Sequence, residues 1–312
     1  MLDGHQLVDA HVHVPVLSTL APSWIDWARQ FGPEGLLERA RDGEGRPRPD
    51  VIDDLFAGRG VDVAVIFCEY SPKATGMQLF DDLLPIVEHN PQRFRPMGNV
   101  NPHLHFPVGD EVRRQLGLGA AGLKLHPVHG GFRCDDPMLY PAYQVLVEER
   151  APLVVHCGTS TFAGSSNQYA DPTYLLPVAR DFPELDIVLA HGGRGWWYEQ
   201  AAFMAMSNPH VWIELSGAAA QAAARVLRRR GSAASGQEDD LRDRLARRAR
   251  DRPQRPRRRR PGARRGRGCG TGRQRPSCLP RPAAGGLTWR STHSATWSRS
   301  SRTPPTSTRT RS

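Results

Sequence analysis

Several residue types are almost missing from the last part of this 312-residue sequence. Residues 226–312 contain no lysine, isoleucine, phenylalanine or tyrosine, and Val226 is their only valine. A segment so poor in large apolar side chains cannot bury enough surface to offset the entropy that a chain loses on ordering. We therefore expect a folded part in residues 1–217 and a disordered tail rich in arginine, proline and serine in residues 218–312.

Other absences exclude further classes of protein. The sequence has no run of about 18 apolar residues, so it predicts no membrane-spanning helix. We expect no signal peptide, because the first residues lack a basic segment followed by an apolar one. The five cysteines are odd in number and form no CxxC pair, which favours a reducing compartment. Together these features predict a cytoplasmic protein.

Charge is divided unevenly along the chain. Residues 1–225 contain 17 Lys and Arg against 27 Asp and Glu, a net charge of −10. Residues 226–312 contain 25 arginines against 5 acidic residues, a net charge of +20. Such a polycation binds phosphate without specificity. Because the tail lacks interleaved aromatic side chains for stacking on bases, we rank a nucleic-acid-binding arm last and expect no specific nucleic-acid partner.

Short, almost continuous apolar segments alternate with amphipathic patterns in the folded part. The predicted strands are Leu7–Val14, Val61–Tyr70, Phe94–His103, Ala120–Val128, Pro152–Ser160, Leu185–Arg194 and Val211–Gly217. The predicted helices are Val51–Ala57, Asp110–Leu116, Met138–Glu149, Tyr174–Asp181 and Trp196–Met206, and residues Ala21–Asp50 form an insertion. This order is typical of parallel strands buried on both faces.

Seven such units predict an α/β fold of the TIM-type (β/α)8 barrel, with the eighth strand and helix missing from this chain. A doubly wound open sheet is the alternative. It is disfavoured because no glycine-rich phosphate loop follows the first predicted strand.

Histidines stand at or near the carboxyl ends of four predicted strands. Alternation along a strand puts His11 and His13 on one face, together with Asp9, and two imidazoles at this spacing can bind one metal ion. By itself this pair is equally compatible with structural histidines. The later strands add His126, which shares a face with Lys124, and then His156 and His191. Convergence from four strands at the catalytic end of a barrel indicates an active site.

The same segments resemble a known family. The DxHxH motif at Asp9–His13, with the GLKLHP, VVHCG and VLAHGG segments, resembles the amidohydrolase superfamily, and most closely its branch containing aminocarboxymuconate-semialdehyde decarboxylase. The resemblance runs from about Leu7 to Gly217. It implies a barrel enzyme, and because relatives are often dimers, a homodimer is expected.

The resemblance also implies roles for individual residues. His11, His13 and His156 would bind zinc or another divalent transition metal, and His191 would act as general acid or base on the water that the metal activates. Lys124 matches a position near the catalytic site. Two other roles for Lys124 stay open: pairing with a carboxylate such as Asp9, or, after carbamylation, bridging two metals.

This chemistry predicts a hydrolase of a small carboxylate, ester, lactone or amide, because zinc lowers the pKa of a bound water to about 7. Non-oxidative decarboxylation of an unsaturated or aromatic acid is the alternative at the same site. A third hypothesis is a catalytically dead remnant. The family ends its eighth strand with an aspartate ligand in a phrase such as FGTDWP, and no such phrase is present.

A shifted reading frame accounts for that loss. Allowed codons for Asp239–Gln254, read from the second base of the Glu238 codon, encode KMIFGTDWPGVPGIAR. In that frame the aspartate codon overlaps Arg244 and Leu245. We therefore hypothesise a frameshift between about Ala218 and Gln237, so that residues 218–312 are out of frame. A natural basic tail is the alternative.

Overall fold

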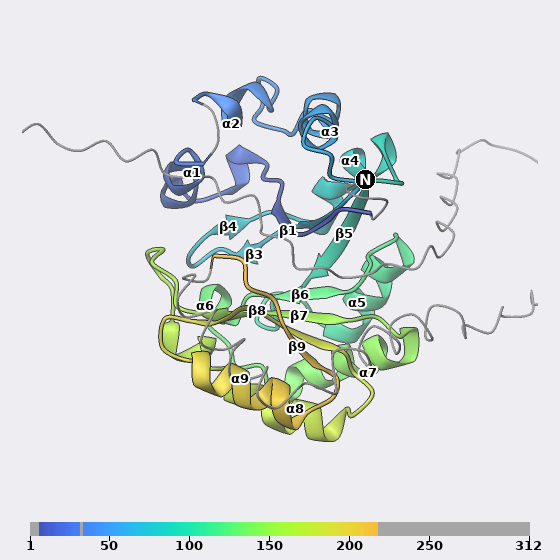
Figure 1. The fold of residues 1–312 in the computed structure, drawn as a ribbon, viewed down its shortest axis with the longest axis vertical. Coiled ribbons are helices and arrows are strands. Elements are labelled where there is room, and N and C mark those ends of the chain that lie inside the picture. The colour runs from blue at the N-terminus through green and yellow to red at the C-terminus, as the bar shows by residue number, and fades with distance from the viewer. Residues whose placement is uncertain (1–5, 32–33, 218–312) are drawn as a thin grey trace, which may run out of the picture.

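The computed structural model describes residues 6–31 and 34–217, and the structural statements below concern those residues. Seven parallel strands form one sheet that curls into an incomplete barrel (Figure 1). In sheet order they are β1 (Val8–His13), β2 (Val63–Phe67), β5 (Phe94–Asn99), β6 (Leu123–Leu125), β7 (Leu153–Gly158), β8 (Ile187–Arg194) and β9 (Val211–Ile213). All seven predicted strands and the α/β barrel class are confirmed. The predicted tail and the missing eighth unit concern residues 218–312, outside the described part.

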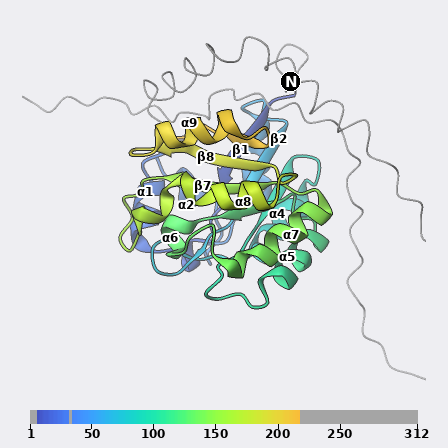
Figure 2. The ribbon, with the colours of Figure 1, turned by 90° about the horizontal axis from the view of Figure 1, so that it is seen from below.

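Helices cover the outer face of the sheet (Figure 2). The five predicted helices are present as α3 (Pro49–Ala57), α5 (Val108–Gly117), α7 (Tyr140–Glu149), α8 (Leu176–Asp181) and α9 (Tyr198–Ser207). In α5, the buried residues Val108, Val112 and Leu116 recur every four positions and so form one apolar face. Three predicted helices, those from Met138, Tyr174 and Trp196, begin two residues before the observed ones. Before α7 and α8 these positions belong to the 3-10 turns η3 (Pro137–Leu139) and η5 (Pro172–Leu175).

Several short elements have no counterpart in the sequence-based prediction. The insertion contains α1 (Pro22–Ala28) and α2 (Leu36–Arg39), preceded by the turn η1 (Leu17–Thr19). The other unpredicted elements are the antiparallel pair β3 (Tyr70–Ser71) and β4 (Gly76–Met77), η2 (Phe80–Leu83), α4 (Leu84–His89), α6 (Pro127–Gly130) and η4 (Asn167–Ala170). Elements of two to seven residues are too short to show a hydrophobic period.

Alternate residues of a strand pack into different cores. In β2, Val63, Val65 and Phe67 belong to a cluster inside the barrel with Val154 and Ala190. Between them, Ala64 and Ile66 pack in a second cluster with residues of α3 and α4. This alternation follows from the two faces of a strand, and it directs the functional side chains to the barrel interior. Within residues 6–31 and 34–217, no helix is long and apolar enough to cross a membrane.

Candidate active site

Six histidine rings form a closed circle at the carboxyl ends of the strands. Their ring centroids are separated, in order, by 4.8 Å, 4.4 Å, 4.9 Å, 5.8 Å, 6.1 Å and 5.4 Å along His11, His191, His156, His129, His126, His13 and back to His11. We call this circle the histidine ring. The structure therefore brings together the four histidines to which the sequence assigned roles, and adds two more.

The backbone conformation near the end of β8 orients the His191 side chain of the ring. His191 has a φ of 68°, a left-handed conformation that is uncommon for a residue other than glycine. The next residue, Gly192, also has a positive φ of 57°, and a Cβ there would lie 3.0 Å from Ile213 Cγ2. The Gly-Gly pair after His191 is thus explained by a tight turn of the backbone against β9.

Burial keeps most of the histidine ring neutral. It lowers the pKa of His13 to about 4 and holds the pKa values of four others well below the usual range, those of His11, His126, His156 and His191. Neutral imidazole is the form that binds a metal ion, because its free nitrogen offers a lone pair. The donors of the ring are therefore in the state that metal binding requires.

One carboxylate contacts the ring from the segment after β9. Glu214 Oε2 lies 3.0 Å from His11 Nδ1, and the backbone N–H of His191 donates to the same oxygen at 3.4 Å. Ligand atoms of these three residues all lie within 4.8 Å of one another, the one such group among the described residues. We call His11, His191 and Glu214 the Glu214 group.

A second carboxylate contacts the ring from the end of β2. Glu69 Oε1 accepts a hydrogen bond from His129 Nδ1 at 2.7 Å and lies 3.3 Å from His126 Nε2. His129 Nε2 in turn accepts from the Ser160 hydroxyl at 3.0 Å. Burial would raise the pKa of Glu69, but the neighbouring His126 and His129 outweigh it and hold that pKa well below the usual range. We call Glu69, His126 and His129 the Glu69 group.

Lys124 is fully buried on β6, and its ammonium lies 4.8 Å from the centre of the Phe67 ring. Burial lowers its pKa to about 8, against the opposing charges of Glu214 and Glu69. Its Nζ has no hydrogen-bond partner within the described part of the chain. The proposed pairing of Lys124 with Asp9 is therefore wrong: Asp9 instead accepts from the backbone N–H of His11.

Three further buried atoms of the site also lack a hydrogen-bond partner in the part of the chain that the structure describes. They are Glu69 Oε2, His126 Nε2 and His156 Nε2. Buried polar atoms are almost always paired, so such atoms indicate a missing water or ion. Imidazole nitrogen and carboxylate oxygen are both ligands of transition metals, although these three atoms do not form a group within 4.8 Å of one another.

Sequence reasoning missed three polar residues of the site: Glu69, His129 and Glu214. Glu214 directly follows β9 and Glu69 lies two residues after β2, so a search for carboxylates at strand ends would have found both. His129 lies on the short helix α6, three residues after His126, and only this helical turn brings it to the ring.

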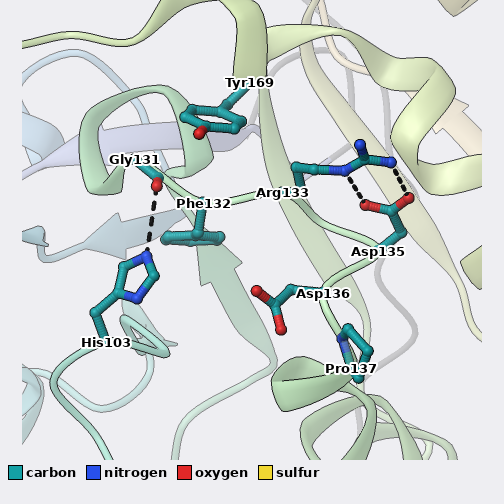
Figure 3. A pocket seen from close by; sticks show the side chains of 8 residues that line it. All are labelled: His103, Gly131, Phe132, Arg133, Asp135, Asp136, Pro137 and Tyr169. Atoms are coloured by element: carbon teal, nitrogen blue, oxygen red, sulfur yellow. Dashed lines mark hydrogen bonds and ion pairs between the residues drawn. The ribbon is translucent and has the colours of Figure 1, made fainter.

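A cavity of about 380 Å³ lies apart from the histidine ring, on the loops that follow β5, β6 and β7 (Figure 3). Its lining includes His103, Phe132, Asp136 and Tyr169, and the ion pair of Arg133 with Asp135 at 2.6 Å. None of the six ring histidines lines it. We place the functional site at the histidine ring, because the cavity's guanidinium is already paired and its described lining residues include no buried polar atom without a partner.

Several solved structures are similar to this chain. An uncharacterized TIM-barrel protein from Bordetella bronchiseptica is similar with a TM-score of 0.52 and 19% identity, over 68% of this chain and 75% of that one. A 5-carboxyvanillate decarboxylase from Sphingomonas paucimobilis gives 0.49 and 17%, over 71% and 84%. A probable 2-pyrone-4,6-dicarboxylic acid hydrolase from Acinetobacter baumannii gives 0.48 and 16%, over 73% and 80%.

Family assignment comes from the sequence match. No curated protein matches the chain. The family model described as Amidohydrolase matches residues 8–258, which include every residue of the histidine ring and both carboxylates. This match agrees with the barrel and with the polar residues gathered at the carboxyl ends of its strands. The chain therefore belongs to the amidohydrolase family of enzymes.

Proposed function

We propose that this enzyme is a metal-dependent hydrolase that acts on a small carboxylate, ester, lactone or amide. The observation that carries the proposal is the closed ring of six histidines at the end of the barrel where such enzymes place their chemistry. A small-molecule substrate, a cytoplasmic location and a homodimer stay predictions from the sequence.

The residues present suit a transition metal. His11, His13 and His156 remain the proposed ligands, and the unpartnered Nε2 of His156 supports the assignment because it leaves a buried lone pair or proton without a partner. Zinc or another divalent transition metal bound there would supply a water acidic enough to ionise at neutral pH.

Two residues of the chain are proposed to handle protons and charge. His191 donates from Nδ1 to the Ser216 carbonyl at 2.7 Å, so its Nε2 is left to take and return a proton. Lys124, with a pKa of about 8, is mostly protonated at neutral pH and has no internal hydrogen-bond partner among the described residues. Its ammonium can therefore stabilise negative charge that develops on the substrate.

The proposed barrel comprises residues 1–217, with residues 218–312 out of frame. Within the described part, β1 pairs only with β2 and β9 only with β8, so an eighth strand would have to pair with both. Asp239–Leu245, the residues at that place in the chain, lack β-branched side chains and include several charged ones. Burying those charges between sheet and helices would cost several kcal/mol each.

The test compares the 312-residue chain with a frame-corrected chain. We expect poor solubility, weak zinc retention and no turnover from the first, and a soluble enzyme active on at least one acid, lactone or amide from the second. Soluble yield, zinc content and product formation are measured, with carbon dioxide detected separately. Release of carbon dioxide would make the enzyme a decarboxylase.

Two results would contradict these proposals. A soluble, zinc-replete and active 312-residue protein would overturn the frameshift and the need for an eighth-strand aspartate. A frame-corrected protein that folds but binds no metal would overturn metal dependence.

A further inference from the structure

We propose that Glu214 is a positioning residue that holds His11 in the tautomer with its proton on Nδ1. His11 then keeps a lone pair on Nε2, the nitrogen left free to bind a metal. This inference rests on the metal dependence proposed above and names a residue with a role in it that the sequence pattern did not single out.

The tautomer follows from one contact. His11 Nδ1 and Glu214 Oε2 are 3.0 Å apart, and the two side chains are only 7% and 19% exposed. An ionised carboxylate has no hydrogen to donate, so the imidazole must donate through Nδ1. A neutral imidazole carries one proton, and Nε2 is therefore the nitrogen with the lone pair.

Glu214 is better placed to accept hydrogen bonds than to bind a metal itself. Its Oε1 accepts from the backbone N–H of Ser216. Its Oε2 accepts from His11 Nδ1, from the Ser216 hydroxyl at 2.7 Å and from the backbone N–H of His191 at 3.4 Å. A carboxylate oxygen has about two acceptor positions, so the three donors fill Oε2 and the Ser216 N–H takes one of the two positions on Oε1. Metal-binding histidines commonly hold such a carboxylate on their other nitrogen.

The same short segment also fixes a second histidine. His191 Nδ1 donates to the Ser216 carbonyl at 2.7 Å, so residues 214–216 set the proton position of both His11 and His191. The His11 contact joins the ends of β1 and β9, the two outer strands of the described sheet, and the His191 contact joins β8 to the segment after β9. The segment after β9 thereby orders two imidazoles that come from opposite ends of the chain's folded part.

The tautomer can be measured without any metal. In metal-free 312-residue protein from the soluble fraction, ¹⁵N NMR of labelled histidine should show the His11 proton on Nδ1. Glu214→Ala should lose that preference, because water replaces the carboxylate. Glu214→Gln should largely keep it, since the glutamine Oε1 still accepts a hydrogen bond. Glu184→Ala, at an exposed glutamate, is the matched control and should leave His11 unchanged.

Zinc affinity gives the second readout, by competition with a chelator on the same proteins. We expect Glu214→Ala to weaken zinc binding by about 10–100-fold, the usual effect of losing such a hydrogen-bond partner, and Glu214→Gln to weaken it much less. A His11 proton on Nε2 in the unmodified chain, or a tautomer unchanged in Glu214→Ala, would overturn the inference. So would a Glu214→Gln variant that loses zinc as completely as His11→Ala, because Glu214 would then be a ligand.

The two readouts separate this inference from the proposed function. Tight zinc binding with the opposite His11 tautomer would overturn the inference and leave metal dependence intact. The expected tautomer, abolished in Glu214→Ala, in a frame-corrected chain that binds no zinc would support the positioning role and overturn metal dependence.

Discussion

The Glu214 group and the Glu69 group are built from the same residue types, one glutamate with two histidines, yet they differ in how the carboxylate is satisfied. Glu214 is 19% exposed and has donors on both oxygens. Glu69 is 4% exposed, and its Oε2 has no hydrogen-bond partner within the described residues. Glu214 therefore has the contacts of an orienting acceptor, whereas Glu69 is a buried carboxylate with a hydrogen-bond donor on Oε1 and none on Oε2 among the described residues.

The two groups also connect different parts of the barrel. Glu214 joins the end of β9 to β1 and β8 through His11 and His191. Glu69 joins the end of β2 to α6, and through His129 to Ser160 after β7. We therefore expect loss of Glu214 to weaken metal binding, and loss of Glu69 to lower the stability of the fold.

The largest expected effect is on metal content. The frame-corrected enzyme should bind about one transition-metal ion per chain, and His11→Ala combined with His13→Ala should abolish binding, because both β1 imidazoles are lost. Metal analysis of the purified proteins checks this. His89→Ala with His210→Ala, at more exposed histidines outside the ring, is the control. Full occupancy in the β1 double variant would rule out a site at this strand.

Replacing His191 tests whether this member of the Glu214 group transfers a proton or binds the metal. If His191 transfers a proton and is not a ligand, His191→Asn should leave metal content near normal while turnover falls by about 10²–10⁴-fold. Metal content and turnover are measured on the same preparation of frame-corrected enzyme. Loss of the metal in this variant would make His191 a ligand and move the metal toward Glu214.

The Glu69 group should matter more for stability. In metal-free protein, Glu69→Ala should cost about 1–3 kcal/mol of unfolding free energy, because the buried His129 Nδ1 loses its acceptor. Glu214→Ala, at a more exposed carboxylate, should cost about 1 kcal/mol. Urea denaturation of the two variants measures the difference. Equal losses of unfolding free energy in the two variants would show that the Glu69 group does not contribute more to stability than the Glu214 group.

The pH dependence of the Glu69 effect has a definite sign. The folded protein holds the pKa of Glu69 below the usual value of 4.5, so its contribution to stability is present above pH 4.5 and is lost as the pH falls further. The stability gap between the unmodified protein and Glu69→Gln should therefore narrow below about pH 4.5. A gap that widens in acid would contradict the charged state of Glu69.

Replacing Lys124 is expected to change the unfolding free energy in the opposite direction. Lys124→Met should raise the unfolding free energy at pH 7 by roughly 1–3 kcal/mol, because it removes a buried ammonium that lacks a hydrogen-bond partner in the described chain. Burial lowers the Lys124 pKa from 10.5 to about 8, so the advantage of methionine should shrink as the pH rises from 8 toward 10.5.

The control for Lys124 is the other lysine of the chain. Lys73 is exposed, and Lys73→Met should leave stability nearly unchanged at every pH. A Lys124→Met protein that is less stable than the unmodified one at pH 7 would show that the ammonium is paired in solution.

Much of the fold could be predicted because its long elements carry a clear hydrophobic period. The β2 segment, with Val63 and Phe67 at its ends, is fully buried and reads as a continuous apolar run. The β3–β4 pair and α6 could not be predicted, because two to four residues show no period. His129 lies on α6, so its place in the site could not be predicted for the same reason.

The sequence by itself determined which strands form and which histidines stand at their ends, because both properties depend on neighbours within a few residues. The shared face of His11 and His13 follows from the two-residue repeat of a strand. Only the tertiary structure decided that Glu214 contacts His11, 203 residues away, and that Glu69 contacts His129, 60 residues away. Contacts over such separations depend on how the sheet curls and where short loops turn, and no local pattern encodes either.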